Sequence, residues 1–401
     1  MIRNRSGWQH SLVAGCAVLA VALGTSMLAT GTATATAAHA GGQREAGLTG
    51  PQVKALKRAL SATEGASRFV APGPALPAAK VRALKGDSIM FLGVGENTFN
   101  TEYLTGVQQA AKAVGMHVIY DNALTAATQV HDIDSAIAQN AKAIILECIV
   151  PTSVSSALTK AKEAHVTVVV GCTGDPRLPT AKVKALGVFG EVTYSYTHSG
   201  KLIAEYDVLK TDGKVDALVQ WFKGLGASDD TVAGFKSVLQ KYCPKTCSAT
   251  YTDIPLTSSG ETSTLQSSAT AAVANPSVNV FFPVYDFMVT YDEPIITSAH
   301  ANSRIILATQ NADLAPMQEL AAGNTAIKAE VGDPTTWEGW ASVDQALRGM
   351  VGMPAVANEH VPTRLFDAAN IKKINLKAPL TTWYGPANYR LDYERLWGVA
   401  K

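Results

Sequence analysis

The sequence has almost no net charge, because 34 lysines and arginines are balanced by 33 aspartates and glutamates, which leaves a formal charge of +1. A protein that binds nucleic acid or an anionic membrane normally carries a clustered positive field. This chain offers no such field, so we expect neither nucleic acid nor a membrane surface as a partner. The ligand expected from this balance is a small molecule.

The sequence also lacks the short motifs that mark common enzyme and metal sites. It contains no G-x-S-x-G elbow, no P-loop and no His-Glu-x-x-His helix, and no histidine stands at ligand spacing to a cysteine pair. Gly93 and Gly95 resemble the start of a dinucleotide-binding loop, but Thr98 occupies the third glycine position. We therefore expect no cofactor, no metal and no catalytic residue.

Long apolar runs are absent beyond the amino terminus. There, two arginines precede an apolar run over residues 12–28 and a small-residue stretch that ends in Ala-His-Ala at 38–40. That order is typical of a secretory signal, and the run is too short and too interrupted for a membrane span. We predict cleavage after Ala40 and a mature chain in the periplasm or on the outer face of the cell membrane. Cys16 also fits a lipoprotein box, so lipidation there stays an alternative.

Cysteine is scarce, and four of the five cysteines lie beyond the predicted leader. An even number of cysteines in an exported chain indicates disulfides. The disulfide candidates are Cys148, Cys172, Cys243 and Cys247. The last two are close enough to close a short loop, and unrelated thiols are the alternative.

From residue 88 the sequence alternates short β-rich runs with amphipathic helical stretches. The strands expected in the first half cover residues 88–92, 118–120, 143–146 and 166–170. The alternation restarts after Lys214, with expected strands at 215–219, 248–254, 278–282, 305–308 and 326–331. Continuous Ile/Val runs separated by helices indicate parallel sheets covered on both faces. We predict an α/β fold of two Rossmann-like lobes, with the ligand between them at the carboxyl ends of the strands.

Several local patterns resemble type I periplasmic solute-binding proteins, in the branch that includes sugar binders. They are Glu-Asn-Thr-Phe-Asn at 96–100 with the helical 103–111, Glu-Cys-Ile-Val-Pro-Thr-Ser at 147–153, Ser-Gly-Lys-Leu-Ile-Ala at 199–204, and Asn-Pro-Ser-Val-Asn-Val-Phe-Phe at 275–282. The resemblance runs from about residue 88 to residue 372. It implies two lobes with parallel sheets, joined by a hinge of three chain segments.

The domain boundaries follow from this resemblance. We expect a signal peptide at 1–40, an N-terminal arm at 41–85 that lies on the first lobe, an N-terminal lobe at 86–190 plus 332–360, and a C-terminal lobe at 191–331 plus 361–401. The chain would cross between the lobes near Glu191, Gly332 and Val361. Such a hinge permits closure by rotation about a few residues.

The resemblance implies a monomeric protein that captures a small solute, a sugar or a related polar or aromatic molecule, and delivers it to the permease of an ABC transporter. The alternative is a ligand-sensing component of a membrane signalling protein. A secreted enzyme is less favoured. A DNA-binding repressor is disfavoured because it would need a helix-turn-helix before the first strand and no export signal.

The candidate ligand-binding residues are those expected just past strand ends or at the lobe crossings. They are Asn97, Phe99, Asn100, Glu147, Thr173, Tyr196, Trp221, Tyr285, Asp286, Asn311 and Glu330. Some have simpler alternatives: Phe99 as packing within its own lobe, Glu147 as a helix cap, Tyr196 as hinge packing and Glu330 as a solvated hinge charge.

One local pattern departs from the sugar binders. Where these usually carry an aspartate and an arginine after the fourth strand, this chain reads Gly-Cys-Thr-Gly-Asp at 171–175. The grip of an arginine on ring hydroxyls is therefore not carried over, and we expect a cleft that is more aromatic and less charged. In the implied strand order, Cys148 and Cys172 follow neighbouring strands, where they form either a disulfide or two buried thiols.

Overall fold

A computed structural model of the chain describes residues 47–400, apart from 66, 96, 256–257 and 386–387. The predicted signal peptide at 1–40 and the alternative lipidation site at Cys16 lie outside these residues. Among the residues that are described, no helix is both long and apolar enough to cross a membrane.

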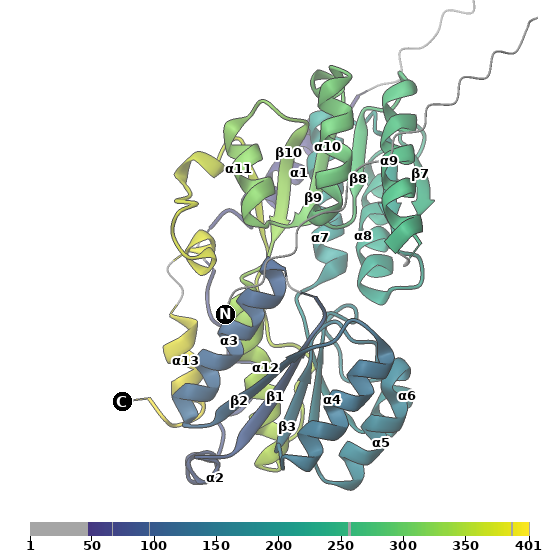
Figure 1. Cartoon of the computed structure of the whole chain (residues 1–401). Helices are drawn as coiled ribbons and strands as arrows, with labels where there is room; N and C mark the ends of the chain where they lie inside the picture. Colours follow the sequence, from purple (N-terminus) through teal and green to yellow (C-terminus); the bar gives the residue numbers. More distant parts are fainter. Residues whose placement is uncertain (1–46, 66, 96, 256–257, 386–387, 401) are drawn as a thin grey trace, which may run out of the picture. The chain divides into compact units, whose positions relative to one another are not determined.

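The first lobe is built on a five-stranded parallel sheet in the order β2-β1-β3-β4-β5 (Figure 1). Its strands are β1 (Ser88–Gly93), β2 (His117–Asn122), β3 (Ala143–Leu146), β4 (Thr167–Gly171) and β5 (Val188–Val192). Its helices are α3 (Thr98–Val114), α4 (Ala126–Ala138), η1 (Pro151–Val154), α5 (Ser155–Glu163), α6 (Ala181–Ala185) and α12 (Thr335–Met350). Alternate side chains of β1 and β3 enter two different hydrophobic clusters, because helices cover both faces of the sheet.

The second lobe is built on a six-stranded sheet in the order β11-β10-β9-β8-β6-β7, in which only β11 is antiparallel to its neighbour. Its strands are β6 (Asp216–Trp221), β7 (Ser248–Asp253), β8 (Val280–Pro283), β9 (Ile306–Asn311), β10 (Ile327–Gly332) and β11 (Arg364–Asp367). Its helices are α7 (Tyr196–Lys210), α8 (Gly226–Tyr242), α9 (Ser258–Ala274), η2 (Asp286–Met288), α10 (Val289–Ser298), η3 (Ala301–Ser303), α11 (Leu314–Ala322), η4 (Ile371–Lys373) and η5 (Leu380–Tyr384).

The predicted α/β fold with two parallel-sheet lobes is therefore confirmed, and each of the predicted strands is present within a few residues. The sequence did not reveal β5 and β11. The first is interrupted by Gly190 and Glu191, and the second is only four residues long with a charge at each end. Neither has the continuous apolar run that identifies a buried parallel strand.

The two ends of the described chain pack differently from expectation. In the N-terminal arm, α1 (Gly50–Ser61) packs on the second lobe, whereas Val81 of α2 (Ala78–Ala83) enters the core of the first. The tail at 361–401 was expected on the second lobe, and its first part, with β11, η4 and η5, packs there. Only the last helix, α13 (Tyr389–Leu396), packs on α12 of the first lobe, where the ring of Tyr389 stacks on Trp337 at 4.4 Å.

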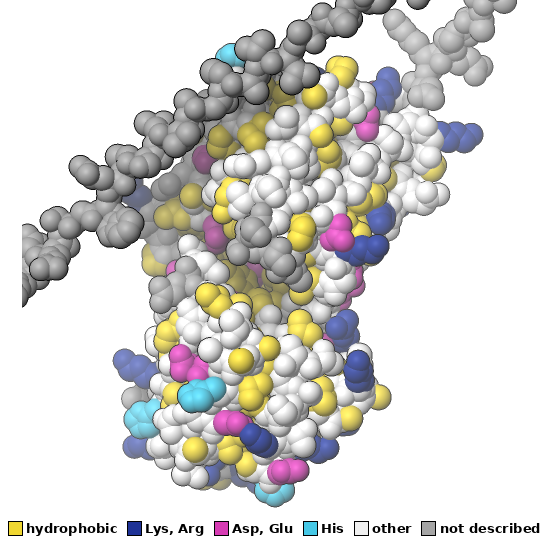
Figure 2. All heavy atoms as spheres, turned by 45° about the vertical axis from the view of Figure 1, so that its right-hand side comes forward, with side chains coloured by type: hydrophobic (Ala, Val, Ile, Leu, Met, Phe, Trp, Pro, Cys, Tyr) yellow, Lys and Arg dark blue, Asp and Glu magenta, His cyan; other side chains and the backbone are white. Residues whose placement is uncertain are grey.

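Both cysteine pairs form disulfides, which confirms the expectation of disulfides. Cys148 and Cys172 join the segments that follow β3 and β4, and Cys243 and Cys247 close the short loop after α8. The first bond stabilises the carboxyl edge of the first sheet, because both cysteines stand directly beyond a strand end. On the face shown in Figure 2, basic and acidic side chains are interspersed, in agreement with the near-zero net charge.

Each lobe contains a pair of helices that glycine allows to pack unusually closely. A Cβ atom on Gly106 of α3 would overlap the backbone oxygen of Thr336, and one on Gly339 of α12 would lie 2.5 Å from the backbone oxygen of Tyr103. In the second lobe, a Cβ atom on Gly200 of α7 would overlap the backbone oxygen of Thr231 in α8. The absence of a side chain at these positions lets the two helix backbones approach.

We expect Gly106→Ala to destabilise the protein by about 2 kcal/mol, because the added methyl group must push apart two backbones that cannot give way locally. Denaturant unfolding should show a lower midpoint with little change in slope. Gly50→Ala is the matched control, because nothing lies within 4 Å of a Cβ atom at that position. Equal stability of the two variants would contradict this account of the helix packing.

Candidate functional site

The first sheet changes its strand order between β1 and β3, and two candidate residues meet at this point. Glu147 directly follows β3, and Asn100 lies in the first turn of α3. The side-chain amide of Asn100 donates a hydrogen bond to Glu147 Oε2 at 2.9 Å, and the backbone amide of Val94 donates to the same oxygen at 2.8 Å. Ligands of open α/β sheets bind in the crevice at such a switch point.

Two further candidates of the first lobe support this arrangement. Asn97 caps α3, because its side-chain oxygen accepts from the backbone amide of Asn100 at 2.8 Å. Phe99 is half-buried, and its ring lies edge-on against Tyr103 at 5.9 Å between centroids. Asn97 therefore fixes the start of the helix, and Phe99 packs on its own lobe while part of its surface stays accessible.

The second sheet changes its strand order between β6 and β8, where aromatic side chains gather. Phe222 follows β6 and Tyr285 follows β8, and their rings stack at 6.1 Å. The candidate Trp221 packs elsewhere, since its ring lies against Tyr251 and the amine of Lys236 lies 5.2 Å above it. The structure therefore places Phe222, rather than Trp221, next to Tyr285.

Asp286, which follows Tyr285 beyond β8, lies beside Asn311, the last residue of β9. Asn311 Nδ2 donates to Asp286 Oδ1 at 3.3 Å, and the backbone amide of Asp313 donates to Asp286 Oδ2 at 2.7 Å. The turn that allows this runs through two non-glycine residues with positive φ, Asn311 at 115° and Ala312 at 58°. Backbone strain of this kind concentrates at functional sites, where the surrounding structure maintains it.

Residues of the first crossing lie between the two sets of strand ends. The rings of Tyr194 and Tyr196 contact each other at 4.4 Å, and both side chains are buried. Thr173, which follows β4, donates through Oγ1 to Glu191 Oε2 at 3.4 Å. The same loop reaches the second lobe, where the backbone amide of Asp175 donates to Asp230 Oδ2 at 2.8 Å. The segments beyond the carboxyl ends of both sheets thus contact each other.

Carboxylates accumulate at the second crossing and around it, contrary to the expectation of a less charged cleft. We call Asp286, Asp313, Glu330, Asp333 and Glu338 the interlobe acidic cluster. Burial, followed by the neighbouring Asp286 and Asp313 carboxylates, raises the pKa of Glu330 well above its usual range. Burial and the Asp333 carboxylate raise the pKa of Glu338 in the same way. The cluster therefore retains protons that exposed carboxyl groups would release.

Only part of this region was predicted from the sequence, where Tyr194 had been considered with Tyr196 for binding or hinge packing. Asp313, Asp333, Glu338 and Tyr103 were not among the candidates. Asp333 and Asp313 stand directly past strand ends, so the rule used for the other residues also applied to them. Glu338 and Tyr103 lie inside helices, where nothing in the sequence distinguishes them from packing residues.

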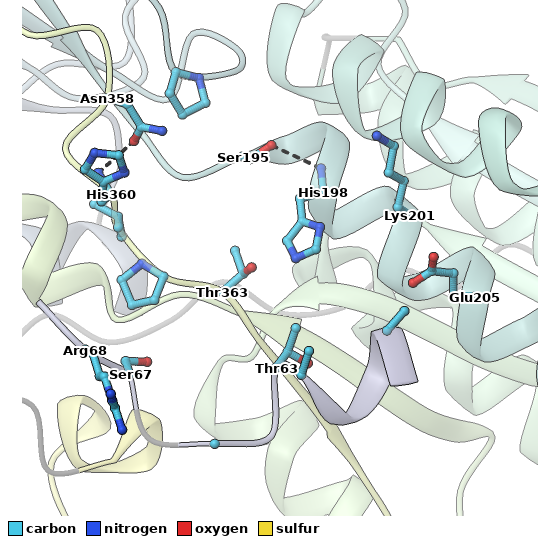
Figure 3. Close-up of a pocket in the computed structure, with 16 residues that line it drawn as sticks. Thr63, Ser67, Arg68, Ser195, His198, Lys201, Glu205, Asn358, His360 and Thr363 are labelled. Carbon is cyan, nitrogen blue, oxygen red and sulfur yellow. Dashed lines mark hydrogen bonds between the residues drawn. The ribbon is translucent and has the colours of Figure 1, made fainter. Parts of the chain in front are cut away.

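A separate pocket of about 720 Å³ opens beside the first and third crossings (Figure 3). His198, Lys201 and Glu205 extend into it from α7, opposite Asn358 and His360. Burial, followed by the charge of Lys201, lowers the pKa of His198. None of the candidate ligand-binding residues lines this pocket.

Glu147 is expected to make the folded protein less stable as the pH rises. Burial raises its pKa from 4.5 to about 7 against the hydrogen bonds from Val94 and Asn100, so the folded state holds the proton more tightly than the unfolded state. This tighter proton binding stabilises the folded state by about 3 kcal/mol. The stabilisation is complete below the pKa that Glu147 has in the unfolded state, and it is lost as the pH rises through the pKa that Glu147 has in the folded state.

Denaturant unfolding at about pH 5 and about pH 8 measures this loss. Between these conditions, Glu147→Gln should lose less free energy of unfolding than the wild type, because its amide oxygen accepts the same hydrogen bonds without a charge. Equal losses would show that Glu147 does not titrate in the folded protein as described.

The comparison with known proteins agrees with this geometry. The family model of the periplasmic binding protein domain matches residues 89–352. No curated protein sequence matches the chain. A 5-methylthioribose transporter solute-binding protein from Thermotoga lettingae is 19% identical, with a TM-score of 0.63 over 78% of this chain and 96% of the other.

Two further solved structures are similar over their whole length. An ABC transporter periplasmic solute-binding protein from Actinobacillus succinogenes, with bound D-allose, is 17% identical, with a TM-score of 0.62 over 72% of this chain and 100% of the other. An ABC sugar transporter subunit from Rhodobacter sphaeroides is 16% identical, with a TM-score of 0.61 over the same shares. At such identities the likeness shows the fold, whereas the family model spans well over half of the chain. The chain therefore belongs to the periplasmic binding protein domain family, a family of solute-binding proteins that are not enzymes.

Proposed function

We propose that the chain is an exported, monomeric solute-binding protein that encloses a small solute between its lobes and presents it to the permease of an ABC importer. The observation that carries this proposal is that residues of the first crossing link the strand ends of the two lobes. Asn100 and Glu147 lie at the switch point of the first sheet, and Phe222 and Tyr285 lie at the switch point of the second. Tyr194 and Tyr196 of the first crossing contact each other, and both interact electrostatically with Tyr285. A solute placed there would contact side chains of both lobes.

The connections between the lobes support a mechanism of closure. The chain passes from β5 to α7, from β10 to α12, and from α12 back to β11. Rotation about these segments would bring the switch points together or separate them. A solute that contacts both lobes only in the closed form shifts the equilibrium toward that form, and the permease then recognises the closed surface.

Relatives with the same fold support a solute of sugar size. The Actinobacillus succinogenes structure holds D-allose, and the Thermotoga lettingae structure holds 5-methylthioribose. The second of these ligands combines a sugar with an apolar group. The stacked rings of Phe222 and Tyr285 would suit a ligand with an apolar face.

A screen of the mature protein against sugars, polyols, nucleosides and small aromatic compounds tests the proposal. A compound that binds only the folded state at a hundredfold excess over Kd adds about 2.7 kcal/mol and raises the melting temperature. Small-angle X-ray scattering should then show a smaller radius of gyration with the compound than without it. Binding without any compaction would contradict the closure mechanism.

Tyr285→Ala and Phe99→Ala should each weaken the binding of a compound found in this screen by about tenfold, because each removes an aromatic face beside a switch point. Isothermal titration calorimetry gives the affinity, and circular dichroism checks that each variant folds. Leu178→Ala removes an exposed apolar side chain outside the candidate site and should leave the affinity unchanged. Unchanged affinity in both aromatic variants would show that the site lies elsewhere.

A further inference from the structure

Three carboxylates of the interlobe acidic cluster are buried with at least one oxygen that has no hydrogen-bond partner among the described residues. Glu330 and Asp333 have no exposed surface, and Glu338 is 1% exposed. Among the described residues, no donor completes a hydrogen bond to either oxygen of Glu330 or Asp333, or to Glu338 Oε2. The backbone amide of Ala312 is near Glu330 and lowers its pKa, but this effect is smaller than that of burial. Buried carboxylates left in this state destabilise a fold.

Elsewhere the same chain pairs a buried carboxylate with hydrogen-bond donors. Asp344 in α12 accepts a hydrogen bond from Arg348 Nε at 2.6 Å and another from Trp397 Nε1 at 2.6 Å. By contrast, no lysine, arginine or histidine among the described residues forms a salt bridge with the interlobe acidic cluster. The lack of cationic partners therefore distinguishes the interlobe acidic cluster from the ion pair of Asp344 and Arg348.

The three carboxylates occupy the second crossing, where the segments of both lobes meet. Glu330 lies near the end of β10, Asp333 follows that strand, and Glu338 lies in the first turns of α12. The other oxygen of Glu338, Oε1, accepts from the backbone amide of Tyr194 in the first crossing at 3.2 Å. This contact joins the cluster to the residues that stand between the two switch points.

A buried hydroxyl points to the same place. Tyr384 is 1% exposed, and its hydroxyl has no hydrogen-bond partner among the described residues. The hydroxyl lies against Gly332, since a Cβ atom on that glycine would overlap it. Gly332 ends β10 and stands two residues after Glu330 and directly before Asp333. The hydroxyl of Tyr384, which has no partner among the described residues, therefore lies beside carboxylates that also lack partners there.

Tyrosine side chains beside the interlobe acidic cluster would also favour a positively charged ligand. The rings of Tyr194 and Tyr196 lie together, and both interact electrostatically with Tyr285 and with Asp333. Aromatic faces combined with carboxylates bind organic ammonium groups through the negative faces of the rings. No group of three His, Cys, Asp or Glu side chains within the described part of the chain is placed to hold a metal ion.

We propose that the solute bound between the lobes is a small organic cation, an amine or quaternary ammonium compound, whose charge is neutralised by Glu330, Asp333 and Glu338 and whose hydrocarbon part packs on Tyr194, Tyr196 and Tyr285. The inference rests on the proposed solute-binding function and specifies its ligand class. In the unliganded protein these carboxyl groups retain their protons, and the uptake of those protons on folding reduces stability near neutral pH. A bound cation favours the ionised carboxylates, whereas a neutral sugar does not.

Matched pairs of probes separate charge from shape. Choline is compared with its neutral carbon isostere, glucosamine with glucose, and putrescine with butanediol, each by isothermal titration calorimetry and small-angle X-ray scattering on the mature protein. We expect at least one cation to bind about tenfold more tightly than its neutral partner and to compact the protein.

Two substitutions with a matched control locate the effect. Glu330→Gln and Asp333→Asn should each weaken the binding of that cation by about thirtyfold or more. Each should also raise the melting temperature of the unliganded protein by a few degrees, because the amide replaces a buried carboxyl group that must take up a proton on folding. Asp207 of α7 is likewise buried without a partner. Asp207→Asn should therefore raise the melting temperature and leave the binding unchanged.

The outcomes separate this inference from the proposed function. A neutral sugar that binds and compacts the protein as strongly as its charged partner would overturn the inference and leave the solute-binding function intact. Cations that bind without compaction would contradict the function and support the charge preference of the cluster. The inference also fails if none of the three cations binds, or if Glu330→Gln and Asp333→Asn lower the melting temperature of the unliganded protein.

Discussion

Parallel strands of one sheet all end at the same edge, and this constraint organises the protein. It brings Glu147 next to Asn100 in the first lobe and Asp286 next to Asn311 in the second, although each pair is far apart in the sequence. The segments beyond the two edges contact each other, as the hydrogen bond from Asp175 to Asp230 shows. This region is where we propose that a small molecule binds, because ligands of open α/β sheets bind beyond the carboxyl ends of the strands.

The second crossing links the stability of the fold to the site. Helix α12 begins beside the interlobe acidic cluster and continues as a fully buried helix that packs on α3 through Gly339 and on α13 through Trp337. The same helix thus carries Glu338 at one end and the compensated pair of Asp344 and Arg348 nearer the other. A tightly held helix fixes the position of its first turn, so the carboxylate at this end is placed with little freedom.

Electrostatics distinguishes the two ends of α12. Near its C-terminal end, a buried carboxylate is matched by a guanidinium and an indole, as expected for a group that only stabilises the fold. Near its N-terminal end, burial and neighbouring carboxylates raise the pKa values of Asp333 and Glu338. Proteins retain such an unfavourable arrangement where function requires it, and a bound solute of opposite charge would remove the cost.

The sequence alone determined the fold class, because continuous apolar runs separated by amphipathic helices have no other stable arrangement than parallel sheets covered by helices. It also placed Glu147, Tyr285 and Asp286 beyond strand ends, since this depends only on where each apolar run stops, whereas Asn311 is the last residue of β9. Short-range patterns could not show that α13 returns to the first lobe, or that Phe222 rather than Trp221 faces Tyr285. The interlobe acidic cluster was decided by tertiary structure for the same reason: whether a carboxylate is paired depends on neighbours that the fold brings from distant parts of the chain.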